Sequence, residues 1–187
     1  MPSIKTILSI TGSASKGSLN QMILANIASL AAENVKFNEF DLMLLPHFNP
    51  TDSIDHPPAP VVEFRQKIEE ADGVIICTPE YIFSIPALLK NALEWCVATT
   101  VFSNKPVALI TASSSGVKAH EQLQLIMNTV GATFTNETTL LISGAKSKLN
   151  IQGEFTDEHT KQAIITFANS FVSSLSSPVN PVNDHSG

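Results

Sequence analysis

The chain has 187 residues, with 11 lysines and arginines against 17 aspartates and glutamates, which gives a formal net charge of −6. This length suits one domain with a single hydrophobic core, and the acidic balance offers no electrostatic footprint for nucleic acid or an anionic membrane. No apolar run approaches the length of a membrane span, and the chain enters its first predicted strand without a signal-peptide core, so we expect a cytoplasmic protein.

The cysteines and histidines show no pattern typical of a metal centre. Cys77 and Cys96 have neither zinc-ligand spacing nor the spacing of a disulfide framework, so we expect two small, buried, apolar side chains. The histidines lie far apart in the sequence, at His47, His56, His120, His159 and His185. The sequence therefore predicts no metal site.

The first strand is predicted at residues 4–11, and the loop that follows it, 12–18, is rich in small polar side chains. A helix predicted near 19–32 begins directly after the loop, and the free N–H groups and positive dipole of a helix N-terminus favour phosphate. The side chains that can donate hydrogen bonds to an anion are Ser13, Ser15, Ser18 and Asn20, and we include Lys16 and Leu19 in the same candidate binding site. The alternative is an ordinary serine-capped connection, which is common in α/β proteins.

Two familiar phosphate-binding motifs are excluded by the spacing of this loop. Gly12 and Gly17 are spaced as in nucleoside triphosphatases, but Ser18 and Leu19 stand where that motif has Lys and then Ser or Thr. The Gly-x-Gly-x-x-Gly fingerprint of dinucleotide-binding domains is also absent after the first strand. A hydroxyl-rich loop with little fixed charge suits the phosphate of flavin mononucleotide (FMN) better than a triphosphate.

The middle of the chain is predicted to contain a second strand near 35–40, a helix near 60–70 and a third strand at 73–78. Between the second strand and that helix, residues 41–60 contain five prolines and show no clear period. This composition indicates a long excursion over the surface. We expect it to contribute to a substrate mouth or to a subunit contact.

Residues 79–85 connect the third strand to an amphipathic helix predicted near 86–98. We interpret Ser84 and Pro86 as the start of this helix, the first as a cap and the second within the first turn. Backbone N–H groups in such a loop have no helical partner, and a planar heterocycle with carbonyl and ring-nitrogen acceptors can use them. This loop is therefore predicted to hold a flavin.

The remaining predicted elements are strands near 106–112 and 135–142 and helices near 117–130 and 157–175. Five alternations of strand and helix predict an α/β fold of three layers, with a flavodoxin-like, doubly wound sheet of five parallel strands in the order 2-1-3-4-5. In that order the loops after strands one and three open into one crevice. We expect one domain over 1–175 and a disordered tail over 176–187.

The first loop resembles that of the NAD(P)H-dependent FMN reductases of flavodoxin-like fold, a family that includes quinone, azo-dye and chromate reductases. The family motif is Gly-Ser-x-Arg-x-x-Ser-x-Asn. It is matched at Gly12, Ser13, Ser18 and Asn20, and Ser15 stands in place of the arginine.

The second loop carries the most specific part of the resemblance. The family sequence is Pro-Glu-Tyr-Asn-x-Ser-Ile-Pro-Gly-x-Leu-Lys-Asn-Ala-Ile/Leu-Asp/Glu-Trp. It is reproduced from Pro79 to Trp95, with Ile82 in place of the asparagine and Ala87 in place of the glycine. A third, serine- and glycine-rich family loop corresponds to residues 112–116, although the usual pair of glycines after it is absent.

The resemblance implies an oxidoreductase in which FMN takes hydride from NADH or NADPH and passes electrons to a small acceptor. That acceptor is a flavin, a quinone, an azo compound or a metal oxyanion. Ser13, Ser18 and Asn20, with Lys16, are implied to hold the phosphate. The residues implied at the ring system are Pro79, Glu80, Tyr81, Ile82, Ser113, Ser114, Ser115 and Gly116. No catalytic side-chain acid or base is required for hydride transfer.

Three of these residues carry more detailed expectations. Glu80 is expected to contribute its backbone N–H, with the carboxylate paired elsewhere, and Tyr81 either flanks the flavin or packs in the core. Ser15 replaces a charge-assisted phosphate contact worth about 1.5–3 kcal/mol. We therefore expect weakened FMN binding unless Lys16 supplies that contact.

Two other functions stay open from the residues. One is a flavodoxin-type electron carrier without nicotinamide turnover, and the other is a non-catalytic flavodoxin-like domain that has drifted away from FMN. The resemblance also implies a homodimer or homotetramer. We expect the helices near 86–98 and 117–130 to form the contact, because Leu93 and Val97 widen the apolar stripe of the first of them.

Overall fold

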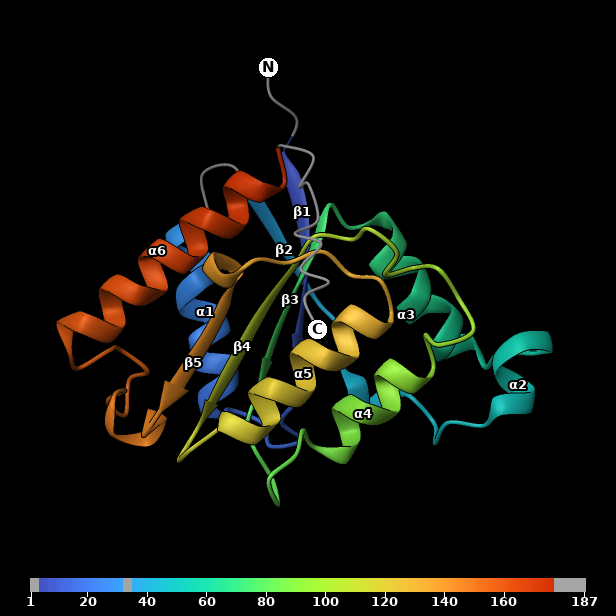
Figure 1. Ribbon diagram of the computed structural model, residues 1–187, viewed down its shortest axis with the longest axis horizontal. Helices are drawn as coiled ribbons and strands as arrows, with labels where there is room; N and C mark the ends of the chain where they lie inside the picture. The colour runs from blue at the N-terminus through green and yellow to red at the C-terminus, as the bar shows by residue number, and fades with distance from the viewer. Residues whose placement is uncertain (1–3, 32–34, 177–187) are drawn as a thin grey trace, which may run out of the picture.

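The computed structural model describes residues 4–31 and 35–176. A sheet of five parallel strands lies at its centre, in the order β2-β1-β3-β4-β5 (Figure 1). The strands are β1 (Lys5–Thr11), β2 (Val35–Glu39), β3 (Gly73–Thr78), β4 (Val107–Ser113) and β5 (Thr139–Ser143). This order confirms the predicted flavodoxin-like sheet, and every strand overlaps its predicted range.

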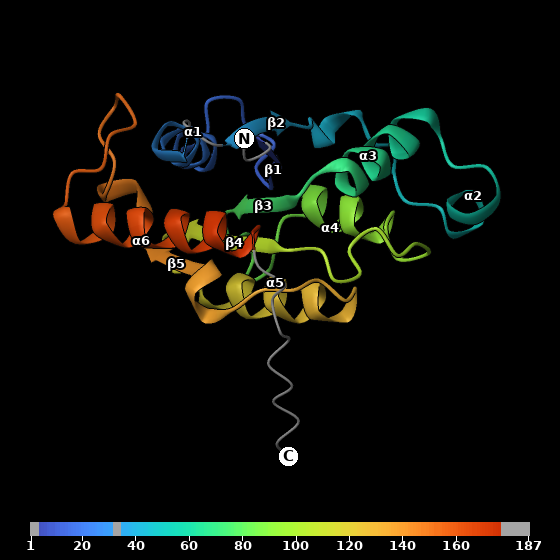
Figure 2. The ribbon, with the colours of Figure 1, turned by 90° about the horizontal axis from the view of Figure 1, so that it is seen from above.

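Helices cover both faces of the sheet and give the predicted three layers (Figure 2). One face is covered by α1 (Leu19–Ala31) and α6 (Glu158–Ser174), and the other by α3 (Ala59–Glu70), α4 (Ala87–Glu94) and α5 (Val117–Thr129). The short elements are η1 (Leu42–Leu44), α2 (Pro50–Asp55), η2 (Asn136–Thr138) and η3 (Ala145–Ser147). Beyond Ser176, the predicted tail lies outside the described residues.

The central strand, β3, is buried along its whole length because both of its faces are covered. Val74 and Ile76 pack in the cluster formed with α3, α4 and α5, whereas Ile75 and Cys77 pack in the cluster formed with α1 and α6. All four side chains are 0% exposed. Coverage on both faces explains why the strand has a continuous apolar sequence rather than an alternating one.

The segment 41–60 differs from the predicted excursion because η1 and α2 form within it. The side chains of Asp41 and Asn49 cap these two elements by accepting hydrogen bonds from backbone N–H groups, at 2.9 and 3.0 Å. Pro50 at the start of α2 supplies a backbone φ already suited to a first helical turn. Local caps therefore make helical turns in a stretch that lacks hydrophobic periodicity.

α4 ends at Glu94, before the predicted end near 98. Trp95, the next residue, is held by two contacts with residues far away in the sequence. The indole N–H of Trp95 donates to the Pro46 carbonyl at 2.8 Å, and the Trp95 carbonyl accepts a hydrogen bond from Arg65 Nε at 2.9 Å. Arg65 lies on α3, so a tertiary contact satisfies a carbonyl that a longer helix would have used.

The start of α4 and its apolar face also differ from the prediction. Pro86 occupies the cap position, where its ring cannot accept a cap hydrogen bond. Ser84, which was expected to be the cap, instead donates its hydroxyl to Gln122 Oε1 on α5 at 2.7 Å. Leu93, expected on the surface of a wide apolar stripe, is 2% exposed and packs in the core, whereas Val97 is 67% exposed. The apolar surface that α4 offers to a second subunit is therefore smaller than predicted.

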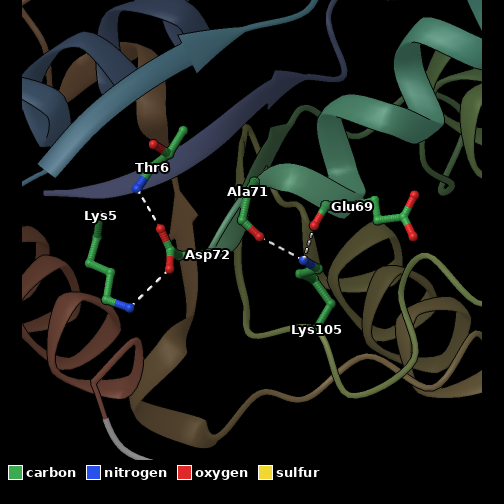
Figure 3. A network of polar contacts seen from close by, with 6 residues as sticks. All are labelled: Lys5, Thr6, Glu69, Ala71, Asp72 and Lys105. Carbon is green, nitrogen blue, oxygen red and sulfur yellow. Dashed lines mark hydrogen bonds and ion pairs between the residues drawn. The ribbon is translucent and has the colours of Figure 1, made fainter. Parts of the chain in front are cut away.

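A polar network closes the edge at which β1 and β3 begin (Figure 3). Asp72 accepts hydrogen bonds from the Thr6 N–H at 2.8 Å and from Lys5 Nζ at 2.9 Å. Lys105 donates to two carbonyls at the end of α3, of which that of Ala71 lies at 2.6 Å. The joint between α3 and β3 is thus fixed from two sides.

The pKa values of this network reflect that pairing. Burial acts to raise the pKa of the Asp72 carboxyl, but the hydrogen bonds from Thr6 and Lys5 and the charge of Lys105 together hold it below its ordinary value. Burial lowers the pKa of Lys105, and the negative charges of Asp72 and Glu69 oppose that effect. The charges at this edge are therefore bound to each other and to backbone groups.

Candidate functional site

Three loops lie at the opposite edge of the sheet, the lower edge in Figure 1. We call them the first loop (12–18, after β1), the second loop (79–86, after β3) and the third loop (114–116, after β4). The register sets the first two level, because Thr11 at the end of β1 pairs with Cys77 near the end of β3. In doubly wound sheets, ligands bind at the carboxyl edge where the strand order reverses.

The first loop packs directly on the end of β3 at Gly12. The Gly12 N–H donates to the Cys77 carbonyl at 2.8 Å. A Cβ at position 12 would lie 2.3 Å from Thr78 Oγ1, which is too close for any side chain, so this approach requires glycine. Thr78 is fully buried, and its hydroxyl donates to the Pro79 carbonyl at 3.1 Å. The first loop is thereby fixed in place relative to the second.

The first loop folds back on its own hydroxyl groups. Ser13 is buried, its N–H donates to Thr11 Oγ1 at 3.4 Å, and its Oγ accepts the Ser15 N–H at 3.3 Å. Ser15 and Lys16 are exposed at the turn of the loop. The loop therefore places a buried hydroxyl at its base and a single ammonium group at its tip.

A capping box closes the first turn of α1. Ser18 Oγ accepts the Gln21 N–H at 3.3 Å, and Gln21 Oε1 accepts the N–H groups of Gly17 at 2.7 Å and Ser18 at 3.3 Å. Sequence reasoning missed Gln21, although Ser-x-x-Gln before an apolar run is the signature of this motif. These bonds occupy N–H groups on which the predicted phosphate site depends.

The side chain of Asn20 lies differently from the prediction. It is 3% exposed, and its Nδ2 donates to Cys77 Sγ at 3.3 Å and to the Ala112 carbonyl at 3.4 Å. These bonds tie the first turn of α1 to the ends of β3 and β4. The neighbouring Leu19 side chain packs against the core cluster of α1 and α6. Neither side chain is directed to an anion at the loop.

A cleft of about 390 Å³ lies between the first loop and the end of β2. Its charged lining residues are Lys16, Glu39 and Asp41, so one positive charge faces two negative charges. Gln21 also lines the cleft, and its Nε2 donates to Glu39 Oε1 at 3.4 Å. The second and third loops do not line this cleft, so it is not the crevice that the sequence predicts between the loops.

The tip of the second loop is a two-residue hairpin turn. Tyr81 and Ser84 exchange both backbone hydrogen bonds, at 2.9 and 3.0 Å. Between them, Ile82 and Phe83 have φ values of 51° and 55°, a left-handed conformation that costs about 1–2 kcal/mol per residue for most side chains. Such turns favour Asn and Gly.

The side chains of this tip are exposed. Tyr81 is 50% exposed, Ile82 96% and Phe83 73%. Tyr81 therefore does not pack in the core, which was one of its two expected positions. Phe83 was not among the predicted site residues, because the family motif leaves its position unspecified. The loop presents three large side chains to solvent on a strained backbone.

Glu80 joins the second loop to α5. Its carboxylate accepts the N–H groups of Gly116 at 3.2 Å and Ala119 at 3.0 Å, as expected for a carboxylate paired within the protein. Gly116 stands at the cap position of α5 with a φ of 86° and no side-chain cap bond, so Glu80 supplies the cap from another loop. The hydrogen bond from Ala119 holds the pKa of Glu80 below its ordinary value, against the effect of burial.

The third loop is tied on its other side to β5. The Ser114 carbonyl accepts the Gly144 N–H at 3.0 Å, and the Ser115 carbonyl accepts the Ser143 hydroxyl at 2.7 Å. Ser113 is the last residue of β4 and is partly buried, whereas Ser114 and Ser115 are exposed. The hydroxyl groups of the loop thus face outward from a backbone that is fixed at both ends.

The cysteines lie where the sequence placed them. Cys77 and Cys96 are free and buried, and burial raises the pKa of both thiols to about 12. Over residues 4–31 and 35–176, no group of three or more histidine, cysteine or carboxylate side chains is arranged to hold a metal ion. In the same ranges no helix is both long and apolar enough to cross a bilayer.

Comparison with known proteins identifies relatives along most of the chain. The model of the NADPH-dependent FMN reductase family matches residues 6–147. The chain is 34% identical over 158 residues to a subunit of an NADH:(hydroxy)cinnamate reductase from Vibrio ruber, covering 81% of this chain and 78% of the relative. It is 33% identical over 167 residues to an NADPH:quinone oxidoreductase from Arabidopsis thaliana, covering 84% and 85%.

The fold is also shared with solved flavoenzymes. FerB, an NAD(P)H:(acceptor) oxidoreductase from Paracoccus denitrificans, superposes with a TM-score of 0.77 at 27% identity, over 94% of this chain and 99% of FerB. The match to the family model covers well over half of the sequence, and the two relatives above exceed 30% identity. The chain therefore belongs to the NADPH-dependent FMN reductase family and is an oxidoreductase that uses FMN as its cofactor.

Proposed function

We propose that this protein oxidises NADH or NADPH and passes the electrons, through FMN at the three loops, to a small acceptor such as a quinone or a flavin. The observation that carries the proposal is the pair of hydrogen bonds from Gly116 and Ala119 to Glu80, which locks the second loop onto the third. The packing of Gly12 on Thr78 adds the first loop to the same assembly. Relatives named for cinnamate and quinone reduction support the class of acceptor.

The first loop fits a phosphate ester in the chemistry of its donors. The hydroxyls of Ser13, Ser15 and Ser18 all lie in the short loop before α1, and Lys16 in the same loop supplies an ammonium group. Backbone N–H groups at the start of α1 add the partial positive charge of a helix N-terminus. These residues would hold the phosphate of FMN, and Leu19 and Asn20 would take part through their backbone rather than their side chains.

The second and third loops would border the flavin ring. Pro79 and Glu80 form a fixed backbone segment, and Tyr81 and Ile82 stand at its exposed end. Residues 113–116 follow at the end of β4, where the Gly116 N–H donates to Glu80. FMN, when bound, supplies the hydride and electron transfer that the protein side chains lack. The side chains therefore bind and orient, and none of them is assigned as a catalytic acid or base.

The tip of the second loop offers an apolar surface to the co-substrates. Tyr81, Ile82 and Phe83 are all at least half exposed, and aromatic and apolar surfaces bind planar rings well. A nicotinamide and a quinone are both planar rings. We assign this surface to the acceptor and donor in turn, as a reductase that binds them one after the other requires.

Assembly and location are part of the same proposal. A homodimer or homotetramer is supported by exposed apolar side chains on the α5 side, with Val117 42% exposed and Leu125 66%, and by Val97 after α4. A cytoplasmic location is proposed with it, and two free, buried thiols are compatible with that compartment. The partner that the proposal requires is a small electron acceptor, without nucleic acid or membrane.

The experiment adds FMN to the purified protein, removes the excess, and records the flavin absorbance spectrum and the steady-state oxidation of NADH and NADPH with a quinone. We expect retained FMN and turnover. In Ser18→Asp, a carboxylate would face the phosphate and lower FMN affinity at least tenfold, while aspartate still caps α1. Ser29→Asp, at the exposed far end of the same helix, is the matched control.

Four outcomes would contradict parts of this proposal. No retained flavin in the unchanged protein would favour a non-catalytic domain. Bound FMN without steady-state turnover would favour an electron carrier. Equal FMN affinity in Ser18→Asp and the control would remove the phosphate from the first loop. Light scattering that reports a fully active monomer would overturn the assignment of a dimer or tetramer.

A further inference from the structure

Gln21 binds the N–H groups that a phosphate at the first loop would use. Its Oε1 lies 2.7 Å from the Gly17 nitrogen and 3.3 Å from the Ser18 nitrogen. An amide oxygen that accepts two backbone N–H groups at the start of a helix occupies the position at which a phosphate oxygen normally binds. The side chain is therefore a substitute for the anion.

Two further contacts hold Gln21 in this position. The Gln21 N–H donates to Ser18 Oγ at 3.3 Å, so the backbone of Gln21 belongs to the same capping box. The other end of the amide donates from Nε2 to Glu39 Oε1 at 3.4 Å. Glu39 can only accept, so it fixes which end of the amide faces the loop. The carbonyl end is thereby turned toward Gly17 and Ser18.

The charges around the loop do not favour displacement of Gln21. Lys16 is the one cation that lines the adjoining cleft, and Glu39 and Asp41 oppose it. Ser15 supplies a neutral hydroxyl. A phosphate dianion that enters here must therefore replace two existing hydrogen bonds close to two carboxylates. The phosphate therefore gains little binding free energy over the hydrogen bonds that Gln21 already makes.

We propose that Gln21 competes with the FMN phosphate for the first loop and so sets how strongly the protein prefers FMN over flavins that lack a phosphate. The inference rests on the proposed function, because it assumes that the flavin phosphate reaches this loop. Gln21 leaves the N–H groups when FMN binds and returns to them when FMN dissociates. The protein thus keeps a capped helix in both states, and its flavin is exchangeable.

Riboflavin is the probe that isolates this effect, because it has the ring system of FMN without the phosphate. Dissociation constants for both flavins can be measured on the whole protein from the quenching of flavin fluorescence, without turnover. For Gln21→Ala we expect FMN to bind about five- to tenfold more tightly, the change that corresponds to loss of a cap contact. Riboflavin affinity should change less than twofold.

A second variant tests the same idea in the opposite direction and keeps the fold. Glutamate also completes a capping box, so Gln21→Glu retains the cap of α1 but puts a negative charge at the N–H groups. We expect FMN affinity to fall at least tenfold and riboflavin affinity to stay the same. Gln162→Ala, an exposed glutamine on α6, is the control for loss of a glutamine far from the loop.

The apoprotein supplies an independent readout. Loss of the capping box in Gln21→Ala should lower the midpoint of thermal unfolding without flavin by about 2–4 °C. Saturating FMN should narrow the gap to the unchanged protein, since phosphate then caps the helix in both. Competition predicts a lower unfolding midpoint together with tighter FMN binding. A purely structural role of Gln21 predicts a lower midpoint together with weaker FMN binding.

The failures of this inference and of the proposed function are distinct. If the unchanged protein binds both flavins and Gln21→Ala leaves the ratio of their dissociation constants unchanged, or weakens FMN, Gln21 does not compete and the inference is wrong. Unchanged FMN affinity in Gln21→Glu overturns it as well. If no variant binds either flavin, the proposed function falls and this inference falls with it.

Discussion

The two edges of the sheet use their polar groups in different ways. At the amino edge, Asp72 binds Lys5 and the Thr6 N–H, and the network joins elements that meet there (Figure 3). At the carboxyl edge, Glu80 holds two loops together, and next to it Ile82 is exposed in a left-handed conformation. The first edge contains paired charges and no residue with positive φ among those of the network. The carboxyl edge contains two residues in a left-handed conformation, Ile82 and Phe83, and the hydrogen bonds of Gln21 that a phosphate is proposed to replace.

This difference indicates where the chain can tolerate unfavourable backbone conformations. Strained residues persist only where the surrounding structure fixes them. Two contacts hold the turn that contains Ile82 and Phe83. Glu80, which precedes the turn, accepts a hydrogen bond from the Gly116 N–H, and Gln122 on α5 donates from Nε2 to the Phe83 carbonyl at 3.3 Å. We therefore expect substitutions at the amino edge to change stability alone and those at the carboxyl edge to change flavin binding as well.

The largest effect is expected from Glu80→Ala. It removes a charged acceptor from two N–H groups at the start of α5, which should lower the free energy of unfolding by about 2 kcal/mol. The freed second loop should also weaken FMN binding by about tenfold or more. Urea unfolding and flavin fluorescence titration measure the two effects.

Glu121→Ala is the matched control for that substitution. Glu121 lies on the same helix and pairs with Lys118 at 2.7 Å on the surface, with both side chains more than half exposed. Its removal should cost less than about 0.5 kcal/mol and leave FMN binding unchanged. Equal effects of the two substitutions would show that Glu80 does not lock the loops.

Asp72→Ala should lower the free energy of unfolding by about 1.5 kcal/mol without changing FMN affinity. The substitution leaves the Thr6 N–H and Lys5 without their acceptor, at a site that is only partly buried. Exposed Asp55 serves as the control position. A change in FMN affinity in Asp72→Ala would break the separation between the two edges.

The same residue predicts a pH dependence. The folded-state pKa of Asp72 lies below its ordinary value of 3.8, so the unfolded state takes up the proton first as the pH falls. The stabilisation by Asp72 is therefore complete above the unfolded pKa and is lost as the pH falls through the folded one. The stability difference between the unchanged protein and Asp72→Asn should shrink over that acidic range.

Ile82→Asn should stabilise the apoprotein by about 1 kcal/mol. Asparagine adopts the left-handed conformation more readily than a β-branched residue does, and it is favoured in two-residue hairpin turns. Ile54→Asn provides the control, because Ile54 is also well exposed, at 72%, but lies in α2. There asparagine should be neutral or slightly destabilising. A loss of stability in Ile82→Asn would mean that the side chain makes compensating contacts.

The smallest effect concerns His120. It is half-buried on α5, its Nδ1 lies 3.0 Å from Thr111 Oγ1, and burial lowers its pKa. Below the ordinary value of 6.5, the unfolded chain takes up a proton that the folded protein resists, so stability falls as the pH falls through that value. His120→Gln should flatten this part of the curve of unfolding free energy against pH. An unchanged slope would contradict the assignment.

Much of the fold could be predicted because its signals are local. Short apolar runs such as 73–78 indicate strands covered on both faces, and three- and four-residue spacing indicates helices. The strand order then follows from alternation, and it places the first and second loops together. The type of loop predicted that the Glu80 carboxylate pairs within the protein, but its partners Gly116 and Ala119 were not predicted.

The differences arise where side chains reach other elements. The direction of Asn20 depends on how α1 rotates against Cys77 and Ala112, which no local pattern contains. The early end of α4 depends in the same way on Arg65 from α3. By contrast, the capping box of Ser18 and Gln21 was readable in the sequence, as was the cap and proline that begin α2.

The burial of the two cysteines affects how readily quinones can alkylate them. Quinones, an acceptor class of the proposed function, are electrophiles, and the thiolate rather than the thiol is the nucleophile that attacks electrophiles. A thiol with a pKa of about 12 is ionised to only about one part in 10⁵ at neutral pH. Cys77 and Cys96 are also 0% and 2% exposed, and the chain has no other cysteine. Repeated turnover with quinones should therefore proceed without alkylation of these two cysteines.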